Sequence, residues 1–203
     1  MDGATFPLWA NWVSLSLAVA GTALGLISAP TALQMLFGKP AIAVEFTNRP
    51  IPTAFNTRVL SVTISNTPIS GRMLRLLGVV RSPVLGLSCM ITLTEKGTGR
   101  ELSEWVAPLI HLGRAVAMSQ QADISPGHLG VEATVIMAMH SDDEGGFKAW
   151  IFHDEHDQME IMPGKYLATA SIITGQPSRK LTRPAMLQIG TDLTSCYWAA
   201  TLK

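Results

Sequence analysis

The hydrophobic pattern divides the chain into one long uncharged segment and a series of short alternating ones. The run from Phe6 to Gly38 contains no charged residue. A helix over 8–29 spans roughly 33 Å at about 1.5 Å per residue, which matches a hydrocarbon core of about 30 Å. We therefore expect one transmembrane helix over 8–29, between an N-terminal flank at 1–7 and an interfacial turn and tether at 30–40.

Aromatic residues and a proline agree with these limits. Trp9 and Trp12 lie at the start of the segment and Phe37 lies beyond its end, where amphipathic rings meet lipid headgroups. Pro30 is typical of a helix boundary. A cleaved secretory signal peptide is the alternative, but the preceding stretch contains Asp2 and no Lys or Arg, whereas a signal sequence starts with positive charge.

Small side chains recur along one face of the expected helix. Their steps of four, three, four and three residues include the spacing Gly-x-x-x-Gly, which lets two helix backbones approach closely. This stripe predicts a helical partner, although such residues are also common in membrane helices that pack on nothing specific. Its members are Ser14, Ala18, Gly21, Gly25 and Ser28.

Orientation depends on few charges. No Lys or Arg precedes the expected helix, whereas Lys39, Arg49 and Arg58 follow it closely. The positive-inside rule then places the N-terminus outside and the following domain in the cytoplasm. Cys89 and Cys196 leave the side open, because they could form one bridge outside or stay reduced inside. The apolar neighbours of Cys89 make it a small core residue.

The remaining chain is long enough for one domain with a real core, which we place at 41–203. The whole sequence of 203 residues has a formal net charge of zero and only 15% charged residues. No basic stripe with interleaved aromatic residues is present, so nucleic acid is excluded as an expected partner.

Short apolar segments separated by turn residues run through this domain and predict about nine strands. No convincing soluble helix accompanies them, which indicates an all-β, antiparallel sandwich. Two of the segments form the arms of a hairpin around an acidic tip at 141–146, with residue 140 opposite 147. The expected strands are 41–46, 59–64, 73–80, 88–94, 131–140, 147–153, 165–174, 185–189 and 194–201.

Two of these segments resemble strands of immunoglobulin-like and fibronectin-III-like sandwiches. Met162-Pro163-Gly164-Lys165-Tyr166 looks like the Pro-Gly-x-Tyr entry into their penultimate strand, where the tyrosine forms a corner. Leu60-x-Val62-x-Ile64-x-Asn66, followed by Met73-x-Arg75-Leu76, is similar to their second and third strands. The resemblance implies an immunoglobulin-like fold over about 41–190 and no particular chemistry.

In such a fold, the first strand begins at the pole that carries the loop before the last core strand. Here that loop is 175–184, and it contains Arg179, Lys180 and Arg183. These cations could contact anionic lipid headgroups or an acidic partner, or they could be ordinary solvated charges.

A metal site has one group of candidate ligands, at 153–157. His153 and His156 could converge on a turn, with Asp157 beside them, and the expected hairpin register brings His128 opposite residue 159. The alternative interpretation is a solvated polar connection, and we expect no metal, no cofactor and no catalytic residue.

These patterns favour a non-catalytic, membrane-anchored interaction protein. It would be an accessory or scaffolding subunit of a membrane protein complex, binding other subunits through the helix and the sandwich. One alternative is a membrane-tethered metal-binding domain or hydrolase built around the histidines. Another is an extracytoplasmic adhesion or sensor module, which could use a bridge between Cys89 and Cys196.

Overall fold

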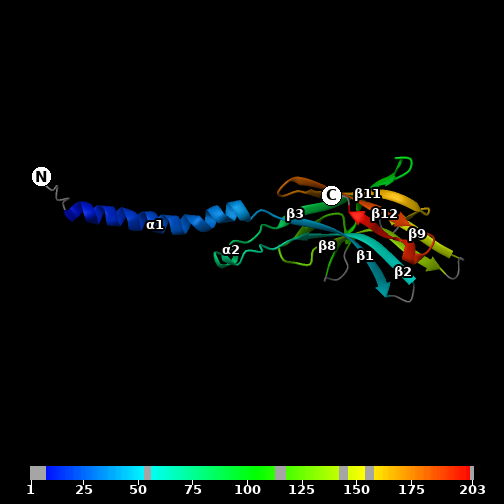
Figure 1. Cartoon of the computed structure of the whole chain (residues 1–203), viewed down its shortest axis with the longest axis horizontal. Helices are drawn as coiled ribbons and strands as arrows, with labels where there is room; N and C mark the ends of the chain where they lie inside the picture. Colours follow the sequence, from blue (N-terminus) through cyan, green and yellow to red (C-terminus); the bar gives the residue numbers. More distant parts are fainter. Residues whose placement is uncertain (1–7, 53–55, 113–117, 142–145, 154–157, 202–203) are drawn as a thin grey trace. The chain divides into compact units, whose positions relative to one another are not determined.

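The computed structural model describes residues 8–52, 56–112, 118–141, 146–153 and 158–201. The chain forms two compact units (Figure 1). One consists of 1–39 with 68–82, and the other of 40–67 with 83–203.

The first unit joins a long helix to a distant segment of the chain. Helix α1 spans Leu8–Phe37 and contains Pro30, so 30–37 is helical where an interfacial turn was expected. The Gln34 side chain holds Val80 at both backbone groups, donating from Nε2 to its carbonyl oxygen at 2.6 Å and accepting from its N–H at 3.0 Å. The Arg81 guanidinium donates to the carbonyl oxygen of Lys39 at 2.8 Å. The end of α1 is therefore fixed to the segment 68–82.

The predicted transmembrane helix at 8–29 is not supported. Within the described ranges, no helix is long and apolar enough to cross a membrane. The sequence prediction relied on the absence of charge from Phe6 to Gly38, and absence of charge alone does not make a helix long and apolar enough to span a membrane. The predicted single-pass membrane localisation depended on this helix, so it is not supported either.

The strand predicted at 73–80 is also wrong. Residues Arg72–Leu76 form the short helix α2, and the likeness of this segment to a third sandwich strand fails with it. The side chains of Met73 and Leu76 are 73% and 83% exposed. A sequence rich in Leu, Met and Arg has a high helix propensity, which here prevails over the apolar pattern.

The second unit is a sandwich of two antiparallel sheets (Figure 1). The first sheet has the order β1-β2-β8-β5-β6, and β9 pairs with both β8 and β10. Its strands are β1 Ile42–Pro52, β2 Asn56–Asn66, β5 Leu109–His111, β6 Met118–Ser119, β8 Val131–Ser141, β9 Gly146–Phe152 and β10 Gln158–Glu160.

The second sheet has the order β13-β12-β11-β3-β4, and β7 pairs with β3. A short 3-10 helix, Leu193–Ser195, precedes its last strand. The strands are β3 Val84–Glu95, β4 Glu101–Ala107, β7 Ala122–Ile124, β11 Gly164–Thr174, β12 Arg179–Ile189 and β13 Tyr197–Thr201. The predicted antiparallel sandwich is confirmed, and at a coarse level it is consistent with an immunoglobulin-like fold.

The tyrosine corner forms as the resemblance implied. Tyr166 is buried near the start of β11, and its hydroxyl donates to the carbonyl oxygen of Met162 at 2.6 Å. Burial, and next the nearby Glu95 charge, raise the pKa of the Tyr166 phenol. In this chain two strands follow the corner strand, β12 and β13, so β11 is not the penultimate strand.

Trp198 joins the edges of the two sheets. From β13 its indole N–H donates to the carbonyl oxygen of Thr47 on β1 at 3.1 Å, and its ring meets Phe46 edge to face at a centroid distance of 4.7 Å. Its backbone N–H donates to Oδ1 of Asn48. The two sheets are thus tied along this side, and fully buried Leu, Ile and Val side chains from both fill the space between them.

Candidate functional site

A groove lies at one pole of the sandwich, where β1 begins and the β11–β12 hairpin turns. Its volume is about 390 Å³, within the range of small-ligand sites in proteins. Both sheets contribute to it. Its lining consists of Pro40, Ala41 and Ile42 before and in β1, Ile172 of β11, and Arg179, Lys180, Leu181 and Arg183 of β12.

Strand alternation explains why this groove has an apolar floor and a cationic rim. Leu181 packs against the hydrophobic core, and Ile172, its cross-strand neighbour on β11, is fully buried. Arg179 and Arg183 are two residues to either side of Leu181, so they leave β12 on the same face. Both are exposed, as is Lys180 on the opposite face of the strand. An anionic ligand with an apolar part matches this arrangement.

The other wall of the groove is held by hydrogen bonds from β2. Asn66 Oδ1 accepts from the N–H of Ala41 at 3.2 Å, and the N–H of Thr67 donates to the carbonyl oxygen of Ala41 at 2.9 Å. The entry into β1 is therefore fixed before any ligand binds.

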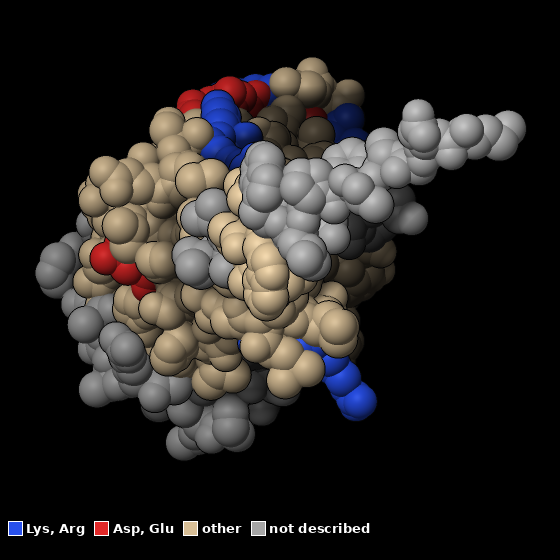
Figure 2. Space-filling model, turned by 90° about the vertical axis from the view of Figure 1, so that its left-hand side faces the viewer, with Lys and Arg blue, Asp and Glu red and all other residues tan. Residues whose placement is uncertain are grey.

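Charges of both signs lie on the protein surface. Figure 2, which faces the left-hand side of Figure 1, shows basic and acidic side chains close together at its upper edge. No carboxylate is among the described residues that line the groove itself. The charged residues that line the groove are therefore all cationic, and an anion is attracted to the groove itself.

The three cations that were expected in a loop lie on strand β12 and line the groove. The predicted loop 175–184 is mostly strand, because β12 pairs with β11 from Arg179 onward. Pro184 lies within this strand, at the point where the pairing with β13 stops and no N–H is needed. Sequence reasoning missed the apolar members of the groove; the alternation of Leu181 with Arg179 and Arg183 was the available signal.

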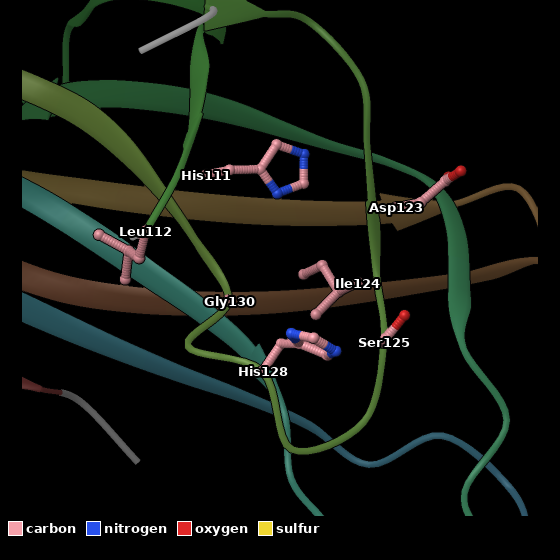
Figure 3. A pocket seen from close by; sticks show the side chains of 7 residues that line it. All are labelled: His111, Leu112, Asp123, Ile124, Ser125, His128 and Gly130. Carbon is pink, nitrogen blue, oxygen red and sulfur yellow. The ribbon is translucent and has the colours of Figure 1, made fainter. Parts of the chain in front are cut away.

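A second, smaller hollow has two imidazoles at its wall. It measures about 50 Å³ and is lined by His111, at the end of β5, and by His128, in the loop before β8. Figure 3 shows Ile124 between them and the Asp123 side chain directed away; Asp123 Oδ1 accepts from the N–H of Gly86 at 2.8 Å. The space suits about one or two water molecules.

The structure separates the histidines that were considered as metal ligands. His153 Nε2 lies 3.1 Å from the Ser103 hydroxyl, and its ring stacks on Trp105. His128 is not opposite residue 159, because Met159 pairs with Ile151. His156 and Asp157 lie outside the described residues. In the part of the chain that is described, no three potential ligands come together.

The stripe of small residues on α1 lies on open surface. All of its members are exposed, and a Cβ added at Gly21 or Gly25 would meet no atom within 4 Å. Its packing on another helix stays a prediction. The stripe comprises Ser14, Ala18, Gly21, Gly25 and Ser28.

Both cysteines are buried free thiols. Cys89 belongs to the core, as predicted, and burial raises the pKa of its thiol to about 12. Burial also raises the pKa of Cys196. The bridge considered for an extracytoplasmic module is absent, and neither thiol has the lowered pKa of a reactive nucleophile.

Comparisons with protein-family models, with curated proteins and with solved structures find no match for this chain. What can be assigned is its class: an antiparallel β-sandwich, immunoglobulin-like at a coarse level, that carries a basic groove at one pole.

Proposed function

We propose that this chain is a non-catalytic interaction protein, an accessory or scaffolding subunit of a protein complex, and that its groove binds an acidic part of a partner. The observation that carries the proposal is the position of Arg179, Lys180 and Arg183 around a preformed, apolar-floored groove. Folds of this kind host many functions, so the proposal depends on the groove and not on the fold.

The chemistry of the groove favours recognition. Guanidinium groups form strong, directional hydrogen bonds with carboxylates, and an apolar floor contributes burial at the same time. The backbone of β12 that carries these arginines is already ordered in the folded protein, which lowers the entropy lost on binding.

Helix α1 supports a role in assembly independently of the groove. Several of its described large apolar side chains are exposed in this chain, for example Trp12 at 67% and Leu17 at 69%. Exposed apolar surface of this kind typically marks an interaction site. We infer that α1 gives the protein a second contact with its complex.

Charge reversal in the groove tests the proposal. The triple variant Arg179→Glu, Lys180→Glu, Arg183→Glu is compared with Lys96→Glu, Arg100→Glu, Lys165→Glu, which changes the same number of charges on exposed residues at the other end of β11. Partners are first identified by cross-linking in the source cells, and each is then purified and titrated against both variants.

We expect the groove variant to lose at least tenfold in affinity for a partner that the control variant binds normally. Affinity for the unmodified protein should fall as salt rises, because charges at an exposed rim are screened. Equal binding by the two variants would refute the groove as the binding site.

A further inference from the structure

We propose that the partner segment binds as an added β-strand along residues 179–184 of β12, and that this segment is extended and acidic. The inference is based on the proposed binding function of the groove and specifies its ligand. It follows from the pairing of β12, from the side chains that line the groove, and from their order along the strand.

The first half of β12 is an open strand edge. On one side β12 pairs with β11 along its whole length, from Arg179 to Ile189. On the other side β13 pairs only with the stretch from Ala185 to Gln188. Within the described ranges, 179–184 therefore has a strand on one side only, and Pro184, which lacks an N–H, stands where the pairing with β13 stops.

An edge of this kind binds extended peptides. Backbone groups that are unpaired at a sheet edge can form a ladder with an incoming segment, while pockets beside the edge select its side chains. Six residues of strand measure about 20 Å at about 3.3 Å each. The groove adjoins this stretch of β12: four of its residues line the groove, together with Ile172 of the paired strand β11.

The side chains of β12 specify the sequence of the ligand. Residues directly opposite in neighbouring strands share a face and contact each other. Acidic residues therefore belong opposite Arg179, Lys180 and Arg183, and an apolar residue belongs opposite Leu181, above the floor formed with Ile172. An added antiparallel strand reads, from its N-terminus, acidic, any residue, apolar, acidic, acidic.

This pattern discriminates between kinds of acidic ligand. A segment that carries only acidic residues pairs with the cations at the rim but leaves the apolar floor exposed to water. A segment with the apolar residue in register satisfies both, and a shift by one residue moves that residue to the opposite face. We therefore expect register, and not net charge alone, to determine affinity.

The test uses the full chain in a neutral detergent, since α1 exposes apolar side chains. The probe is the capped peptide Thr-Glu-Thr-Val-Glu-Glu-Thr. Two matched peptides carry backbone N-methyl groups at alternate residues, one set on each edge of the strand. Affinity is measured by titration calorimetry, and protection of the amides of residues 180–183 by hydrogen exchange.

Strand addition predicts that the probe binds and slows exchange on the open edge of β12. It also predicts that one N-methylated peptide loses at least tenfold in affinity while the other, methylated on the edge that faces away, binds like the parent. Moving the valine by one position should weaken binding to a similar extent.

Equal affinity of all three peptides would overturn strand addition and leave the groove as a charge-based site. No binding of the probe, or binding that the triple charge reversal does not reduce, would also overturn it. In either case the titration of the native partner against the two charge-reversed variants decides the proposed function separately.

Discussion

The hydroxyl of Tyr166 donates to the carbonyl oxygen of Met162, four residues earlier, at 2.6 Å. This bond closes the turn that leads into β11, the strand that joins β12 to β3 in the second sheet. Tyr166 thereby fixes the start of the strand whose other end supplies Ile172 to the groove.

Tyr166→Phe should destabilise the protein by about 1 kcal/mol, because the ring remains in place and one hydrogen bond is lost. In a domain of this size the melting temperature should fall by about 2–4 °C in a calorimetric scan. Tyr197→Phe, at a half-exposed tyrosine on β13, is the matched control and should change little. Equal shifts in the two variants would contradict the role of the corner.

Gly130→Ala should be strongly destabilising. Gly130 has a φ of 90°, and an added Cβ would lie 2.3 Å from the carbonyl oxygen of Ile64. Left-handed backbone and a clash with main chain together should cost at least about 2 kcal/mol in urea unfolding. Gly97→Ala has open space and should be nearly neutral; a similar loss there would mean that the assay reports something other than this clash.

Alkaline pH should destabilise the protein through Cys89. Burial raises the pKa of this thiol from 9.0 to about 12, so the folded state keeps a proton that the unfolded state releases. The contribution is complete below pH 9 and is lost as pH rises toward 12, at up to about 1.4 kcal/mol per pH unit.

The comparison with Cys89→Ala isolates this contribution. Urea midpoints measured under reducing conditions at pH 8 and at pH 10.5 should fall more in the unmodified protein than in the variant. Parallel losses in both would show that other groups cause the alkaline sensitivity.

Gln34→Ala should release the segment 68–82 without affecting the sandwich. The lost amide binds both backbone groups of Val80, so the amide of Val80 should exchange with solvent much faster. Hydrogen exchange read by mass spectrometry follows the two units separately. Met35→Ala, at the exposed neighbouring residue, should leave the exchange of Val80 unchanged.

The sequence was most predictive where alternation was strong and turns were well marked. The β8–β9 hairpin has the expected register, with His140 opposite Phe147. The Pro-Gly-x-Tyr segment identified the tyrosine corner because it combines a turn signal with a buried strand. The antiparallel sandwich followed from these local features.

Other elements depend on tertiary context. Strand β4 has the sequence Glu-Leu-Ser-Glu-Trp-Val-Ala, in which only Trp105 and Ala107 are buried. Its apolar residues do not alternate with polar ones, so the sequence lacks the period of two that predicts a strand. Strands β5, β6 and β7 have two or three residues each. Such short segments carry no pattern of their own and are strands because they pair with neighbouring strands. At 73–80 a strand was predicted where none forms. Its apolar residues suggested a buried strand, but several of them are exposed and 73–76 belongs to helix α2.

The candidate site was predicted through its charges and not through its shape. Arg179, Lys180 and Arg183 were found because cations cluster there in the sequence. The floor of the groove requires β1 and β12 to meet at one pole, which local patterns do not contain. The metal hypothesis placed His128 opposite residue 159 by extending the hairpin register past Ile136 and Ile151, where the pairing of β8 with β9 stops, and past Val131, where β8 begins.

The bond from Trp198 to Thr47 also bears on how the chain folds. It joins residues 151 positions apart, so the edge of β1 at Thr47 stays uncovered until Trp198 has been synthesised. Contacts of such long sequence separation slow folding, and uncovered strand edges promote aggregation. We therefore expect the newly made protein to fold late and slowly, and to depend on chaperones until Trp198 bonds to Thr47 and joins the edges of the two sheets.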